Sequence, residues 1–78
     1  MKIGTILKNG TKVLKFTNTE YGGYVLCDTL NMSGHRYATW AINDGGDTFW
    51  GHYSETLTEA TEDFHNRVDK LIRHQRVQ

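Results

Sequence analysis

One stretch of this chain has the spacing of an amphipathic helix, and it lies in the C-terminal third of the sequence. Its apolar residues recur at intervals of three or four: Leu57, Ala60, Phe64, Val68 and Leu71. This spacing places them on one face of a helix. Thr56 and Glu59 match a capping box, in which a hydroxyl and a carboxylate three residues apart satisfy free amides of the first turn. We therefore predict a helix over residues 57–74.

Two pairs of opposite charge stand four residues apart on this predicted helix, Asp63 with Arg67 and Asp69 with Arg73. Such pairs are neighbours on a helix surface, where each adds a few tenths of a kcal/mol. We expect both pairs on the outer side of the helix, away from the apolar stripe.

The rest of the chain alternates turn signals with short runs of β-forming residues. Pro is absent and Gly occurs eight times. Asn9-Gly10 stands between two apolar runs and predicts a hairpin with a type I′ turn, which needs a positive φ at both central residues. Further turns are predicted at residues 18–23, 31–34 and 44–46. The strands expected between the turns cover residues 2–8, 11–17, 24–30, 36–43 and 47–54.

These elements predict the α+β class: an antiparallel meander of about five strands with one C-terminal helix packed on one face. With 78 residues and 9.0 kDa, the chain has room for a single domain, residues 1–78. A helix of 18 residues is about 27 Å long, which is enough to cover one face of such a sheet. The other face is therefore expected to stay open.

The 44–46 turn sets the expected pairing of the last two strands, with Trp40 opposite Trp50. The residues assigned to the helix face are Trp40, Ile42, Trp50, Leu14, Phe16 and Leu26. The open face then carries Tyr37, Phe49 and Tyr53. These three aromatics are interpreted either as a binding surface, since aromatics are enriched at interfaces, or as a second cluster under the N-terminal hairpin.

Charge is balanced over the whole chain but unevenly placed. Nine Lys and Arg match nine Asp and Glu, which excludes a generic polyanion binder driven by bulk charge. No Lys or Arg occurs between Arg36 and Arg67, and the acids of this interval are Asp44, Asp47, Glu55, Glu59, Glu62 and Asp63. Two interpretations are open: acids that favour a helix N-terminus, or an acidic face for a partner protein with a basic surface.

The residues that carry chemistry are sparse. Cys27 is a lone cysteine, which excludes an internal disulfide and predicts a structural role. The sequence contains no phosphate-binding loop and no nucleophile motif. Its four histidines do not have the spacing of metal ligands. His52 is interpreted as a hydrogen-bonded structural residue, with ligand contact or catalysis as the alternative. We expect that the protein is not an enzyme and that it has no catalytic residue, no metal and no cofactor.

The sequence also bears on location. No stretch approaches the roughly 20 apolar residues that cross a bilayer, and the apolar run near the N-terminus is broken, unlike that of a signal peptide. We expect a cytoplasmic protein that does not contact a membrane.

Three neighbouring segments together resemble a known group of sequences. They are Tyr37–Trp40, then Gly46–Tyr53 with its W-G-H-Y run, then Thr56–Phe64 with L-x-E-A followed by D-F. The pattern is similar to that of small uncharacterised proteins of Gram-positive bacteria, their prophages and plasmids. Ser54 departs from it, because the family pattern has a bulky apolar residue there. The resemblance implies a mobile-element setting and no particular activity.

Two classes of function compete at this point. The first is a non-enzymatic protein-interaction module, such as a phage accessory protein or an inhibitor of a host defence or nucleic-acid enzyme, acting through the acidic face. The second is a nucleic-acid binder that uses the open-face aromatics and the N-terminal lysines Lys2, Lys8, Lys12 and Lys15. Zero net charge favours the first, and we expect no useful binding of DNA or RNA. Self-association as a homodimer is compatible with either class.

Overall fold

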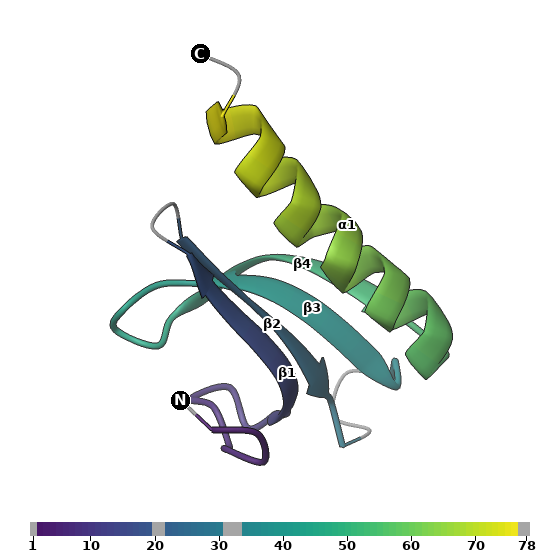
Figure 1. Ribbon diagram of the computed structural model, residues 1–78. Helices are drawn as coiled ribbons and strands as arrows, with labels where there is room; N and C mark the ends of the chain where they lie inside the picture. Colours follow the sequence, from purple (N-terminus) through teal and green to yellow (C-terminus); the bar gives the residue numbers. More distant parts are fainter. Residues whose placement is uncertain (1, 20–21, 31–33, 77–78) are drawn as a thin grey trace.

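The computed structural model describes residues 2–19, 22–30 and 34–76, and shows a sheet crossed on one face by a helix (Figure 1). The strands, in chain order, are β1 (Lys12–Thr19), β2 (Gly22–Asp28), β3 (Tyr37–Ile42) and β4 (Thr48–Ser54). Each strand pairs antiparallel with the next. The helix α1 (Leu57–Arg76) follows β4. The α+β meander with a C-terminal helix is thus confirmed, with four strands rather than the predicted five.

Residues 2–8 do not form the predicted strand. This segment folds back on the start of β1 through a single bridge, Ile6 to Lys12, and two hydrogen bonds to Val13. The amide of Gly4 donates to the Val13 carbonyl at 2.7 Å, and the Val13 amide donates to the Thr5 carbonyl at 2.9 Å. A third bond runs from the Leu7 amide to the Thr11 carbonyl at 2.9 Å, and the segment contributes one bridge rather than a strand.

The turn at Asn9-Gly10 is present but is not of type I′. The Gly10 amide donates to the Leu7 carbonyl at 2.9 Å, and only Gly10, with φ 87°, has a left-handed backbone in this turn. The Asn9 side-chain oxygen accepts hydrogen bonds from both the amide and the hydroxyl of Thr11, at 3.1 and 2.7 Å. Side-chain bonds of this kind compete with ladder formation, which accounts for a compact loop in place of a hairpin.

The helix begins as predicted. The Thr56 hydroxyl accepts a hydrogen bond from the Glu59 amide at 3.2 Å and donates to the Glu59 carboxylate at 2.9 Å. Ala60 and Phe64 are buried, whereas Leu57, in the first turn, is 48% exposed. The C-terminal end of α1 extends past the sheet (Figure 1).

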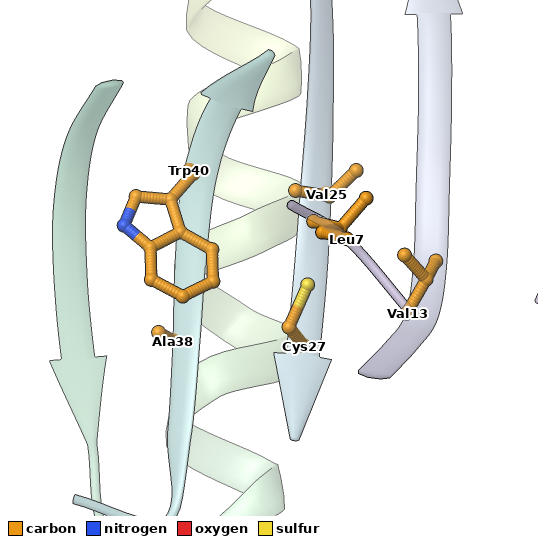
Figure 2. Close-up of a cluster of buried hydrophobic side chains, with 6 residues drawn as sticks. All are labelled: Leu7, Val13, Val25, Cys27, Ala38 and Trp40. Carbon is orange, nitrogen blue, oxygen red and sulfur yellow. The ribbon is translucent and has the colours of Figure 1, made fainter. Parts of the chain in front are cut away.

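Both faces of the sheet are covered by apolar contacts. On the helix face, Leu26, Ala60 and Phe64 form a buried cluster, against which pack Leu14, Tyr24, Tyr37 and Val68. On the opposite face, Figure 2 shows a second cluster that stands on β1, β2 and β3 with α1 behind the sheet. Its members are Leu7, Val13, Val25, Cys27, Ala38 and Trp40, with Ile42 packed against them. The expectation of one open sheet face is therefore wrong, because Leu7 of the N-terminal loop packs over the second cluster.

The assignment of faces from sequence was inverted for β3. Trp40 and Ile42 lie opposite the helix, whereas Thr39 and Tyr37 face it. Side chains alternate along a strand, so the position of Thr39, which bonds to the helix, fixes the rest. Trp40 joins Leu7 and its neighbours in the cluster on the face away from the helix.

The register between β3 and β4 changes at a β-bulge. Ala41 pairs with Phe49 as predicted, but beyond it Thr39 pairs with His52 and Ala38 with Tyr53. The shift of one residue is absorbed at Trp50, whose φ of 52° lies in the left-handed region. A bulge of this kind places two residues of one strand opposite one residue of the other.

Gly51, next to Trp50, allows the Trp40 indole to approach β4 closely. A Cβ on Gly51 would lie 2.5 Å from Nε1 of Trp40, which is far inside van der Waals contact. The Trp40 indole therefore lies against the bare backbone of β4. The same bulge turns Trp50 outward, and its side chain is 76% exposed.

Candidate functional site

The three aromatics predicted on one open face do not share a face. Tyr37 is half-buried in the helix-face cluster, and Phe49 also lies on the helix side, where it is 40% exposed. Tyr53 lies on the opposite face, with its ring edge-on to Trp40 at 6.1 Å between centroids. The bulge at Trp50 separates Phe49 from Tyr53, so these residues form no common surface.

The six predicted acids fall into two groups at opposite ends of β4. Asp44 and Asp47 lie in the turn before β4, and the other four follow its end. In the described part of the chain, four of the six contact another side chain: Asp47 with Lys8, Glu55 with His35, Glu59 with Thr56, and Asp63 with His52. The acidic interval therefore does not form one continuous face.

A groove on the helix side of the sheet is the main surface feature beside Trp50. It has a volume of about 500 Å³ and lies between the β3–β4 turn and the C-terminal half of α1. Its aromatic and charged lining residues are Tyr24, Phe49, Trp50 and Asp44. The rings of Phe49 and Trp50 are 6.0 Å apart and inclined at 56° to each other, so they form an angled wall.

The β3–β4 turn that carries Asp44 is tightly bonded. The Asn43 amide donates to the Asp47 carbonyl at 3.1 Å, and the Asn43 carbonyl accepts from Gly46 at 3.0 Å. The Asn43 side-chain oxygen accepts from the Asp47 amide at 2.9 Å. These bonds hold Asp44 at the rim of the groove.

The sequence pattern predicts Trp50 in the core, whereas its side chain lies at the surface. The signal that could have corrected it was Gly51, since an isolated Gly inside a strand often marks a bulge or a close backbone approach. Here it marks both.

A polar network joins α1 to β3 and β4 next to this groove. The carboxylate of Asp63 accepts a hydrogen bond from the Thr39 hydroxyl at 2.5 Å and lies 3.0 Å from Nδ1 of His52. Nη1 of Arg67 donates to both the carbonyl and the hydroxyl oxygen of Thr39 at 3.1 Å, and its guanidinium lies 4.9 Å from the centre of the Tyr24 ring.

The prediction that Asp63 and Arg67 form an outward pair is thus wrong, because both side chains bond to Thr39 of the sheet. Asp69 and Arg73 do form the expected surface pair, at 3.1 Å.

The network lowers the pKa of Asp63. Partial burial acts to raise this pKa, but hydrogen bonds from Thr39 and His52 and the charges of His52 and Arg67 outweigh it. The ionised carboxylate is therefore favoured in the folded state, and His52 is hydrogen-bonded to it at 3.0 Å.

We expect Asp63→Asn to lower the free energy of unfolding by about 1–3 kcal/mol at pH 7, since it removes the charge from a set of charge-assisted hydrogen bonds. A depressed folded-state pKa stabilises the fold above the unfolded value of about 3.9. The difference between wild type and variant should therefore shrink as the pH falls below about 4. Urea denaturation from pH 7 to pH 2.5 measures it. Asp69→Asn, on the exposed side of the same helix, should cost only a few tenths of a kcal/mol at pH 7; an equal loss in both variants would contradict the network.

A second hollow, of about 450 Å³, lies beside this network. It shares Tyr24 and Leu71 with the Trp50 groove and is otherwise lined by polar and charged residues: His52, Asp63, Asn66, Arg67 and Lys70. The two hollows adjoin under the same helix, and they differ in charge.

The thiol of Cys27 lies in the cluster opposite the helix and is fully buried. Burial raises its pKa to about 11, against the opposing effect of a hydrogen bond to Thr11. The thiol is therefore protonated near neutral pH and has no access to a substrate. In the described ranges, no three His, Cys, Asp or Glu side chains gather as they would around a metal ion. In those same ranges, α1 is not apolar enough over a sufficient length to span a membrane.

Comparisons of the chain with protein-family models, with curated proteins and with solved structures found no match.

Proposed function

We propose that this protein is a non-enzymatic interaction module that binds a partner protein through Trp50 and the groove beside it. The observation that carries the proposal is the backbone of Trp50. A bulky residue at φ 52° is rare, and its strain is of the order of 1–3 kcal/mol. This strained residue is also 76% exposed, so it gains nothing from burial in the free protein. A partner that covers the ring would supply that gain.

The size of the surface is adequate for an anchor. A Trp side chain buries roughly 150–250 Å² when it is covered, and Trp is among the residues that most often dominate binding energy. Phe49, 40% exposed and in contact with Trp50, extends the same apolar patch. The patch is held by the paired strands β3 and β4, so it is presented without a prior change of shape.

The partner that fits this surface has a basic face. Among the residues that the structure describes, Asp44 is the only charged one that lines the groove, and no Lys or Arg lines it. The likeness to proteins of mobile elements supports a phage accessory protein or an inhibitor of a host defence or nucleic-acid enzyme, located in the cytoplasm. The acidic residues then contribute through Asp44 rather than through one long acidic face.

Binding of nucleic acid is the competing function, and the groove favours it less. Lys8, one of the four lysines that would contact phosphates, lies 3.4 Å from the Asp47 carboxylate. Asp44 at the rim of the groove would repel a phosphate backbone. Sub-micromolar binding of DNA or RNA at about 150 mM salt, with a steep salt dependence, would establish this function instead.

The test compares the capture of a defined partner by wild type and by Trp50→Asn. Asn tolerates the left-handed backbone, so the variant should unfold at the same or a slightly higher urea concentration than wild type. Partners are recovered from a Gram-positive host lysate, identified, purified and titrated by calorimetry. We expect the affinity of Trp50→Asn to fall at least 30-fold, which corresponds to about 2 kcal/mol.

Leu57→Ala is the matched control, because Leu57 is an exposed apolar residue away from the groove. It should leave the affinity within threefold of wild type. Equal losses in the two variants, or none in Trp50→Asn, would overturn the proposal. Sedimentation of the free chain covers the remaining case: a dimer that Trp50→Asn converts to a monomer would show that the groove binds a second copy and not a different protein.

A further inference from the structure

We propose that the groove beside Trp50 seats an arginine side chain of the partner. This inference rests on the proposed function and names the chemical group that the groove recognises. In the described part of the chain, its lining combines three aromatic rings and one carboxylate, which is the set that binds an organic cation by its ring faces and its charge.

The arrangement of the rings matches a planar cation. Phe49 and Trp50 are inclined at 56° with their centroids 6.0 Å apart, so they present two walls that meet at an angle. A guanidinium is planar and weakly hydrated, and it stacks on aromatic faces more readily than an ammonium does. The groove, at about 500 Å³, has ample room for one arginine side chain.

The protein already makes this kind of contact next to the groove. The guanidinium of Arg67 lies over the ring of Tyr24, which also lines the groove, at 4.9 Å from its centre. There Asp63 and Arg67 both bond to the hydroxyl of Thr39, so a carboxylate belongs to the same network as the stacked cation. In the Trp50 groove the carboxylate is that of Asp44, which lies in the bonded 43–47 turn.

Charge distinguishes this groove from its neighbour. The adjoining hollow is lined by Arg67 and Lys70 as well as Asp63, so a cation is disfavoured there. An arginine that approaches this side of the molecule is therefore directed to the Trp50 end.

The test uses small probes and the protein alone. Acetyl-arginine amide is titrated into the ¹⁵N-labelled protein, and the indole N–H signals of Trp50 and Trp40 are followed by NMR. The Trp50→Asn variant assigns the Trp50 signal by removing it. We expect a saturable shift of the Trp50 signal with a millimolar Kd, and no comparable shift of the buried Trp40 signal. Acetyl-citrulline amide has nearly the same shape without the charge, and it should bind at least fivefold more weakly.

Asp44→Asn should weaken binding of the arginine probe at least fivefold, whereas Asp69→Asn, which makes the same change of net charge on the outside of α1, should change it less than twofold. Equal binding of arginine and citrulline probes, or equal effects of the two Asp variants, would overturn the inference. The outcome is separable from that of the proposed function. If partner capture depends on Trp50 while the probes fail to bind, the arginine site is wrong and partner binding through Trp50 is supported. If the probes bind but capture does not depend on Trp50, the arginine site is supported and the proposed partner binding through Trp50 is wrong.

Discussion

Trp40→Ala is expected to leave most of the protein unfolded at room temperature. The indole is 8% exposed and belongs to the cluster that Leu7 caps opposite the helix. Truncation of a buried Trp costs about 3–5 kcal/mol, and a domain of this size has a total stability of only a few kcal/mol. Far-ultraviolet circular dichroism of the variant, followed through a urea titration, should show little or no folded baseline.

Trp50→Ala is the matched control for this result. It removes an equally large side chain that is 76% exposed, so the free energy of unfolding should change by less than about 1 kcal/mol. The sequence pattern predicts both tryptophans in one core. If Trp50→Ala proves as destabilising as Trp40→Ala, that prediction is right and the bulge does not expose Trp50 to solvent.

Phe64→Ala is expected to have the second largest effect on stability, about 3–5 kcal/mol. Phe64 is 3% exposed and packs between the helix and the sheet together with Leu26 and Ala60. These residues form the buried centre of the helix face, and loss of the ring would leave a cavity between α1 and β2. Thermal unfolding followed by circular dichroism measures the effect, with partial loss of helix signal expected already at 25 °C.

Leu57→Ala tests whether position in the stripe or actual burial decides the cost. Leu57 and Phe64 both belong to the apolar stripe of the helix, but Leu57 is 48% exposed. Its removal should therefore cost less than about 1 kcal/mol. A loss in Leu57→Ala that equals the loss in Phe64→Ala would show that the first turn of the helix packs on the sheet in solution.

The elements that depend on near neighbours could be predicted from the sequence. Thr56 and Glu59 define the start of α1 through bonds that span three residues, and the helix begins where they predict. The pairing of Asn43 with Asp47 across the β3–β4 turn follows in the same way. The failure at Asn9-Gly10 is also local: the sequence signal marks a reversal of the chain, but the side chain of Asn9 bonds to Thr11 in place of a ladder.

The candidate site, in contrast, came from the tertiary structure. Strand alternation separates the two faces of β3 but does not say which face meets the helix, because either choice gives the same pattern in the sequence. The choice depends on contacts between residues far apart in the chain: Leu7 with the Trp40 cluster, and Thr39 with Asp63 and Arg67. Once Trp40 lies on β4, position 51 has no room for a side chain. The exposure of Trp50 accompanies the register shift between β3 and β4, which the alternation of residues 48–54 does not reveal.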